Sequence, residues 1–241
     1  MGLIPCRIFA DSATNPTAAV ISLERFGIAF AAGDARHAES LLAALKGWHP
    51  WYEVNDPPPA WEPYLAAWSA QSHATVRYAF AHNTSFDTAA LQKLATPPEG
   101  CQIVPYTHAL LEQALTSQWS EDQMGTYTDI DSFLAEGFGL CVVKDGKIIS
   151  GCASFCRHPD GYEIQVDTHP DFRGKGLAKA VSAAFILALN ARGLMPYWDA
   201  ANVKSMRLAE KLGFVFSRAF VGWILVASHA DADAVDQQVV G

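Results

Sequence analysis

Hydrophobic and polar residues alternate in different ways along the chain, and the pattern predicts a mixture of strands and helices. Early in the chain it indicates one or two strands in 21–30, a further strand in 76–81 and a short helix in 88–94. Asp34 is a favourable N-terminal cap, and apolar residues up to Leu45 follow it at helical spacing. A helix is therefore expected there, but no motif in this part of the chain suggests a chemical role.

A segment rich in proline and glycine, 96–100, is the clearest linker in the sequence. It predicts a boundary between a small α/β lobe over residues 1–99, whose role the sequence leaves open, and a second domain over residues 100–228. The tail, 229–241, is polar, acidic and poor in core-forming residues, so we expect it to be disordered.

Beyond the linker the elements become regular, and strands alternate with helices in the manner of an α/β domain. Thr107 caps one helix, Asp145-Gly146 forms a hairpin turn, and the helix after 174 is apolar nearly all round, so it should lie against a sheet. The expected elements, in order, are strand 102–106, helix 107–115, a helix around 133–134, strands 138–144, 147–156 and 162–167, helix 174–191, strand 195–198, helix 202–212 and a terminal hairpin formed by 214–216 and 220–226.

The composition is that of a globular protein with a substantial core. The 241 residues are 50% hydrophobic with a mean hydropathy of +0.08, enough to bury one large core or two modest ones. Charged residues or histidine interrupt every apolar run before the roughly 18 residues that a membrane-spanning helix needs. Pro5 and Arg7 interrupt the apolar stretch at the N-terminus, which lacks the features of a signal peptide, so we do not expect export.

Charge and cysteine usage narrow the classes of partner and site. A net charge of −8 without any basic cluster argues against nucleic acid and against an anionic membrane surface, and it requires any site for an anionic ligand to be locally positive. The five cysteines are scattered; Cys152 and Cys156, with His158 nearby, form the only grouping, without the close pairs of a zinc site. We expect reduced core thiols, no metal site and a cytoplasmic location.

The most informative stretch is residues 168–178, Thr-His-Pro-Asp-Phe-Arg-Gly-Lys-Gly-Leu-Ala, which links an alternating strand to the apolar helix. Gly174 and Gly176 remove side chains where backbone N–H groups must approach a ligand, and the helix adds unpaired N–H groups and a positive dipole end. A phosphate ester suits such a turn, although the spacing fits neither a Walker P-loop nor a Rossmann fingerprint. The alternative is an ordinary strand-to-helix loop in which Arg173 and Lys175 are merely solvated.

Three ordered segments carry a resemblance to a known family. Residues 173–178 fit Arg-x-x-Gly-x-Ala, 202–205 fit Asn-x-x-Ala/Ser, and 210–214 read Glu-Lys-Leu-Gly-Phe. These segments resemble motifs of the GNAT superfamily of acetyl-CoA-dependent N-acyltransferases, in which the first segment binds a pyrophosphate. The resemblance covers roughly half of the chain, 101–227, and 198–202 is similar to a bacterial branch that has an N-terminal α/β region of its own.

The resemblance implies the GNAT acyl-CoA N-acyltransferase fold, an α/β fold with a mixed sheet in which two parallel neighbours splay apart, preceded by a smaller N-terminal α/β lobe. It implies transfer of an acetyl group from acetyl-CoA to a primary amine of a small molecule or a protein. From charge, cysteine spacing and the separate N-terminal lobe we expect no metal, nucleic acid or membrane as partner, and a homodimer as one assembly. The alternative is a CoA-binding sensor or interaction module with little or no activity. The residues implied in cofactor binding are Val166, Thr168, Arg173, Gly174, Lys175, Gly176, Leu177, Ala178, Asn202 and Ser205.

The implied reaction needs a proton acceptor, because an amine must be neutral to attack a thioester. Glu163, on the polar side of the strand before the turn, is the first candidate, although it could be solvated on an open sheet face. Asp199 is the second candidate, and it could equally be a turn or capping residue. In the family a backbone N–H of the strand before the turn, here within 166–168, stabilises the carbonyl oxygen.

The sequence departs from the family pattern at one position that bears on catalysis. Many family members place a tyrosine, acting as general acid, directly before the Glu-Lys-Leu-Gly-Phe segment, where this sequence has Ala209. Tyr197 and Tyr127 are substitutes that do not occupy the motif position. We therefore expect slow acetyl transfer in which water protonates the CoA thiolate.

Overall fold

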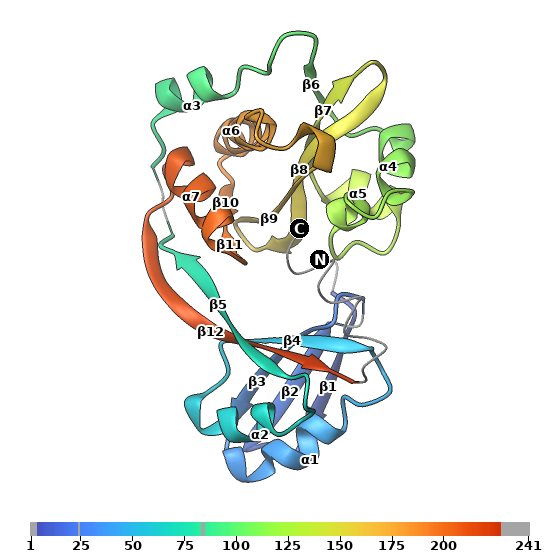
Figure 1. Ribbon diagram of the computed structural model, residues 1–241, viewed down its shortest axis with the longest axis vertical. Coiled ribbons are helices and arrows are strands. Elements are labelled where there is room, and N and C mark those ends of the chain that lie inside the picture. Colours follow the sequence, from blue (N-terminus) through green and yellow to red (C-terminus); the bar gives the residue numbers. More distant parts are fainter. Residues whose placement is uncertain (1–3, 24, 83–84, 228–241) are drawn as a thin grey trace. The chain divides into compact units, whose positions relative to one another are not determined.

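The computed structural model describes residues 4–23, 25–82 and 85–227, and these fall into two compact units (Figure 1). Unit 1 contains the described residues of 3–77 and 219–241, and unit 2 contains those of 78–218. The tail predicted at 229–241 lies outside the described residues. The division between the units thus falls at 77/78, and the linker at 96–100 lies within unit 2.

The segment between that division and the linker belongs to unit 2 because it is part of that unit's core. Phe80, at the end of β5 (His73–Phe80), and Leu91, in α3 (Thr88–Leu94), are buried in one cluster with the long helix α6 (Leu177–Asn190). The proline-rich segment at 96–100 is a surface loop, since its composition reports local turn chemistry and not where hydrophobic contacts end.

Unit 1 is a sheet with short helices packed on one of its faces. Its strands, in sheet order, are β1 (Cys6–Ala10), β2 (Ala18–Leu23), β3 (Ile28–Gly33), β4 (Trp51–Asn55), β12 (Phe216–Val226) and β5, the last two of which continue into unit 2. Its helical segments are η1 (Ala35–His37), α1 (Ala38–Ala43), η2 (Pro59–Trp61) and α2 (Glu62–Ala66). Asp34 caps η1 as predicted, and Val20, Leu42 and Trp61 lie in the core of this unit.

Unit 2 is a five-stranded mixed sheet with helices on both faces. The strand order is β10 (Met195–Tyr197), β9 (Gly161–Thr168), β8 (Lys147–His158), β7 (Gly139–Lys144) and β6 (Gln102–Pro105), and only β10 and β9 are parallel. The other elements are α4 (His108–Leu115), η3 (Glu121–Met124), α5 (Ile130–Glu136), η4 (Pro170–Phe172), β11 (Asp199–Ala200) and α7 (Val203–Leu212). The predicted caps form: Thr107 accepts from Leu110 N–H, and Asn202 accepts from Ser205 N–H.

Helix α6 is the hydrophobic centre of unit 2. It packs on β7, β8 and β9 and also contacts α3 and α7, which explains why its sequence is apolar nearly all round (Figure 1). Val181, Phe185 and Ile186 are fully buried. The helix begins at Leu177 and not at Gly174 as predicted, because Gly174 and Gly176 have φ of +78° and +81°, outside the α-helical region.

The prediction of a terminal hairpin is wrong. Residues 216–226 form the single strand β12, which Figure 1 shows as one long arrow. Ser217, Arg218 and Ala219 provide neither the positive φ nor the preset φ that a tight turn requires, so nothing interrupts the extended backbone. The C-terminal half of β12 then pairs antiparallel with β4, from Gly222↔Asn55 to Val226↔Trp51.

Candidate functional site

The turn between β9 and α6 exposes backbone donors to open space. Gly176 is the N-cap of α6 and has no side chain to accept a hydrogen bond from the first-turn N–H groups. A Cβ atom built on Gly174 or Gly176 would meet no atom within 4 Å, so the space beside both residues is open. This geometry suits an anionic group such as a pyrophosphate, which needs N–H donors and room to approach them.

Two cationic side chains are fixed to the same turn. Arg173 Nε donates to the carbonyl of Thr168 at 3.1 Å, and Lys175 Nζ donates to the carbonyl of Asp171 at 3.0 Å. Lys175 also lies over the ring of Phe172, 4.7 Å from its centroid. Both side chains are exposed yet held by backbone carbonyls, so they concentrate positive charge at the turn of a protein whose net charge is −8.

The parallel strands β9 and β10 separate part-way along β9, the strand that leads into this turn. They pair only from Met195↔Gly161 to Tyr197↔Glu163, after which the chain from β10 enters β11 and pairs with β5, Asp199 opposite Ala79. On the other edge of β9, His169 N–H donates to Ile149 O at 3.0 Å. Because N–H groups of a strand alternate between its two edges, those of Val166 and Thr168 point to the edge that β10 leaves.

The two predicted catalytic residues, Glu163 and Asp199, meet where β9 and β10 separate. Glu163 Oε1 accepts the backbone N–H of Asp199 at 2.9 Å, and Glu163 Oε2 lies 3.9 Å from His158 Nε2. The Glu163 side chain is 23% exposed. Glu163 is thus anchored across the separating strands and not simply solvated on an open sheet face, whereas Asp199 contributes its backbone to this contact.

A cavity of about 150 Å³ adjoins Glu163. Its lining includes apolar and polar side chains, and two of the polar ones are histidines that were not among the predicted site residues. The lining residues are Ala79, Phe80, Ala81, His82, His158, Glu163, Pro196, Tyr197, Trp198 and Phe214. The signal that could have found His158 is its position at the end of β8, across the tight turn from the strand that carries Glu163.

Several predicted site residues have structural partners of their own. Ser205 Oγ accepts the indole N–H of Trp198 at 3.1 Å, and its backbone N–H donates to Asn202 Oδ1 at 2.9 Å. Ala209 is fully buried in the core of unit 2. The two hydrogen bonds of Ser205 order the start of α7 and hold it against Trp198, between β10 and β11.

Neither candidate tyrosine is an effective acid at neutral pH. The Tyr197 hydroxyl donates to Asp160 Oδ1 at 2.6 Å, and this hydrogen bond raises the pKa of Tyr197 to about 12. Burial raises the pKa of Tyr127 to about 12, and its hydroxyl accepts from Ser154 Oγ. Tyrosine therefore does not replace the missing general acid through an easily lost proton.

A partly buried chain of polar side chains begins on the same strand as Glu163. Asp167 Oδ2 accepts from the side-chain amides of Gln165 and Gln123, and Gln123 in turn accepts from the Tyr106 hydroxyl at 3.1 Å. Burial raises the pKa of Asp167 to about 6 despite the two amide donors. This chain of hydrogen bonds ties η3 and Tyr106, the residue after β6, to the strand that precedes the turn.

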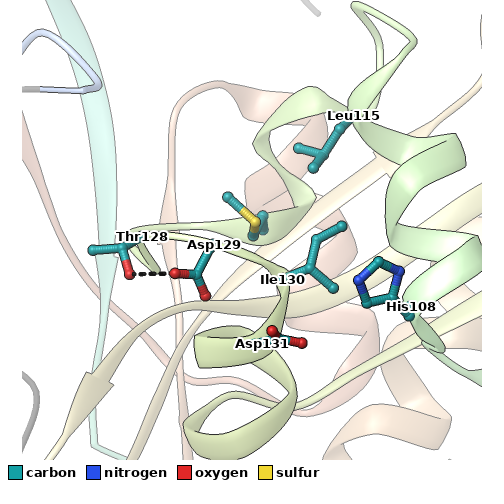
Figure 2. A pocket seen from close by; sticks show the side chains of 7 residues that line it. His108, Leu115, Thr128, Asp129, Ile130 and Asp131 are labelled. Carbon is teal, nitrogen blue, oxygen red and sulfur yellow. Dashed lines mark hydrogen bonds between the residues drawn. The ribbon is translucent and has the colours of Figure 1, made fainter.

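A larger cavity, of about 380 Å³, lies elsewhere in unit 2, between α4 and α5 (Figure 2). Its lining residues are His108, Leu115, Met124, Thr128, Asp129, Ile130 and Asp131. Figure 2 shows Thr128 and Asp129 hydrogen-bonded to each other, and Asp129 also caps α5 by accepting from Ser132 N–H. None of the predicted site residues lines this cavity, whereas Glu163 lines the smaller one.

Two features are absent from residues 4–23, 25–82 and 85–227. No three histidine, cysteine, aspartate or glutamate side chains in these ranges are grouped so that they could hold a metal ion. No helix in the same part of the chain has the length and apolar character needed to cross a membrane.

Comparisons with known proteins find similarity over nearly the whole chain. A family model described as GNAT acetyltransferase matches residues 2–223. The chain is 26% identical to the uncharacterized N-acetyltransferase YdfB of Bacillus subtilis over 225 residues, which cover 88% of this chain and 82% of YdfB. Mycothiol acetyltransferase of Thermobispora bispora is 38% identical over 85 residues, 34% of this chain and 29% of that protein.

Among solved structures, a GCN5-related N-acetyltransferase-like protein from Streptococcus suis has 34% sequence identity and a TM-score of 0.83, over 90% of this chain and 87% of that one. An acetyltransferase of the GNAT family from Novosphingobium aromaticivorans, at 19% identity and a TM-score of 0.58, covers 91% of this chain and 92% of that one and is similar in fold. The matches include the N-terminal region, in which the sequence analysis found no motif.

Proposed function

We propose that this chain, which belongs to the GNAT acetyltransferase family, transfers an acetyl group from acetyl-CoA to a primary amine of a small molecule or a protein. The observation that carries the proposal is the turn at 173–176, which presents backbone donors and two cations after the end of β9, one of the two strands that separate. A pyrophosphate on the turn would let the rest of the cofactor run along the open edge of β9.

The residues proposed to bind the cofactor follow from that placement. Backbone N–H groups of 174–178 would receive the pyrophosphate, and Arg173 and Lys175 would offset its charge. The N–H groups of Val166 and Thr168 face the edge where the pantetheine arm and the thioester carbonyl would lie. Asn202 and Ser205 order the start of α7, and we propose that they contact the cofactor from there.

Acetyl-CoA supplies the activated acyl group as a thioester. A primary amine with a pKa near 10.4 is protonated at neutral pH and must lose a proton before it attacks. The two residues that the sequence suggests as acceptor of that proton, Glu163 and Asp199, meet where β9 and β10 separate. The cavity next to Glu163 would hold the amine.

The departing CoA thiolate is the conjugate base of a thiol with a pKa near 8.5, and it can take its proton from water. Ala209 cannot supply one, and this favours either slow transfer or a second function, a CoA-binding sensor or interaction module with little activity. The chain's membership of an acyltransferase family supports the first function.

All five cysteines are free thiols, which supports a reducing compartment. We therefore propose that the protein is located in the cytoplasm.

We also propose that the chain forms a homodimer through unit 1. Ile8, Ile21 and Phe30 are cross-strand neighbours there, and their side chains are 65%, 38% and 45% exposed. Sedimentation equilibrium that gives a monomer mass at micromolar concentration would rule out the dimer.

Turnover tests the proposed activity. The full chain is incubated with acetyl-CoA and a panel of primary amines and lysine-containing peptides, and free CoA thiol and acetylated product are both measured. We expect product in proportion to the thiol released. Tight acetyl-CoA binding without any product would support the non-catalytic function instead.

A further inference from the structure

We propose that His158 takes the proton from the acceptor amine and that Glu163 positions it. This inference rests on the proposed acetyl transfer and assigns its base. It departs from the sequence-based choice of Glu163 as the base, because the structure places a second proton acceptor against that carboxylate. His158 ends β8, Glu163 lies in β9, and both line the cavity of about 150 Å³.

The Glu163 carboxylate is fixed in a way that favours a positioning role. One oxygen, Oε1, accepts the Asp199 N–H at 2.9 Å, which holds the side chain against β11. The other oxygen, Oε2, faces His158 Nε2 at 3.9 Å. A carboxylate at this distance stabilises an imidazolium, so the pair can store a proton taken from a third group.

Side chains from neighbouring segments restrict the position of the His158 imidazole ring. Its ring packs on the ring of Tyr197, with centroids 4.5 Å apart, and Tyr197 is itself held by Asp160. On its own strand, Cys156 Sγ lies 3.9 Å from Nε2. His82 packs on Tyr197 with centroids 4.9 Å apart.

The protonation states of these groups favour His158 as the acceptor. Burial lowers the pKa of His158, Asp160 opposes that shift and His82 adds to it, so the imidazole is largely neutral at pH 7. Burial raises the pKa of the Cys156 thiol to about 12, so this group stays protonated. His82 also lines the cavity, but it is His158 that faces the anchored carboxylate.

In the proposed reaction the acceptor nitrogen loses two protons and gains the acetyl group. The ammonium of the acceptor gives one proton to His158, and the nitrogen lone pair then forms the C–N bond with the thioester carbonyl carbon. The C–S bond breaks with its electron pair on sulfur, and the thiolate takes the second proton from the nitrogen, directly or through water. His158 returns its proton to solvent, so one amide, one CoA thiol and one proton are formed.

The pH dependence of turnover in the full chain tests this assignment. The acceptor is whichever of phenethylamine, cadaverine and ethanolamine the wild type acetylates fastest; the first matches the apolar lining of Phe80, Trp198 and Phe214. We compare wild type, His158→Gln and Glu163→Gln between about pH 5.5 and 9.5. His73→Gln, an exposed histidine of unit 1, is the control.

For His158→Gln we expect kcat/KM to fall about 10²- to 10⁴-fold near neutral pH, with the acidic limb of the profile lost. The deficit should shrink toward high pH, where the amine loses its proton unaided. Glu163→Gln keeps an oxygen that accepts the Asp199 N–H but removes the negative charge that stabilises the protonated His158. The acidic limb of its pH profile should therefore move to lower pH, and kcat should fall. The dissociation constant for acetyl-CoA should stay unchanged in both variants.

Distinct outcomes separate this inference from the proposed function. If the wild type binds acetyl-CoA but acetylates none of the three amines, the proposed transfer fails for this class of acceptor and the inference fails with it. If the wild type turns over and His158→Gln keeps its rate and its acidic limb, only the inference is overturned. Loss of the limb in His82→Gln, but not in His158→Gln, would overturn it as well.

Discussion

The carboxylate of Glu163 accepts a hydrogen bond from the backbone N–H of Asp199 at 2.9 Å. The bond joins β9 to the start of β11 just where the pairing of β9 with β10 ends at Tyr197↔Glu163. A side chain thus replaces the strand-to-strand hydrogen bonds that stop at this point. Glu163 consequently has a structural role in addition to the proposed chemical one.

The two roles of Glu163 can be separated by substitution. Glu163→Ala leaves the Asp199 N–H without its acceptor, and we expect a loss of about 1–3 kcal/mol in the free energy of unfolding. Glu163→Gln retains an oxygen at the same place and should lose less than about 0.5 kcal/mol. Urea denaturation measures both. Equal stability of the two variants would show that the hydrogen bond contributes little.

The raised pKa of Asp167 predicts that the free energy of unfolding depends on pH. Burial raises its pKa from 3.8 to about 6 in the folded protein, which then binds the proton more tightly than the unfolded chain does. Its contribution is fully present below the unfolded value and is lost as pH rises through about 6. Asp167→Asn can still accept from Gln165 and Gln123, so at pH 7.5 we expect it to be more stable than wild type by on the order of 1–3 kcal/mol.

Urea denaturation at about pH 4 and pH 7.5 checks this prediction, with Asp171→Asn, an exposed residue, as the control. When the pH rises from about 4 to 7.5, the free energy of unfolding of the wild type should fall by more than that of Asp167→Asn. A parallel pH dependence in wild type and Asp167→Asn would contradict the assignment.

Ala209→Tyr restores the residue that many family members have, but the structure predicts that it does not fit. Ala209 is 0% exposed and lies in the same cluster as Trp198 and Phe214. A phenol ring there overpacks the core, and we expect a loss of about 1–3 kcal/mol in stability without a gain in kcat. Glu210→Tyr, at the neighbouring exposed position, should leave stability within about 0.5 kcal/mol of wild type. A stable Ala209→Tyr variant with a higher kcat would contradict this.

Substitution of Leu91 tests whether helix α3 belongs to the core of unit 2. It is 1% exposed in the cluster that contains α6, although the sequence-based boundary at 99/100 assigns it to the N-terminal lobe. Leu91→Ala should therefore destabilise the chain by about 2–5 kcal/mol. The control is Leu134→Ala in α5, where the side chain is 43% exposed and little should change. A loss below about 0.5 kcal/mol for Leu91→Ala would show that α3 contributes little to unit 2.

Features that depend on local chemistry could be predicted from the sequence. The caps at Thr107 and Asn202 require only that a side-chain oxygen reach an N–H three residues on, and both form. The turn at 173–176 and the apolar helix after it follow from glycine and from hydrophobic spacing. The mixed sheet followed from the family resemblance.

Features that depend on long-range packing could not be predicted. The contact between His158 and Glu163 needs the register of β8 against β9, which shifts between Ser154 and Cys156. The division of the chain into units depends on which core Phe80 and Leu91 enter, and a proline-rich loop does not report that. The hairpin predicted for 214–226 failed because hydrophobic runs alone do not reveal whether a strand is interrupted.

Calorimetric titration with acetyl-CoA tests the central claim, that the turn at 173–178 binds the cofactor's pyrophosphate. Gly176→Asp and Gly176→Asn place similar side chains at the same positive φ, which asparagine and aspartate tolerate best among residues with a side chain, and they differ in charge. We predict that wild type binds one acetyl-CoA per chain, and that Gly176→Asp binds at least about tenfold more weakly than Gly176→Asn because its carboxylate faces the phosphates. Absence of binding by the wild type, or equal affinity in the two folded variants, would contradict the claim.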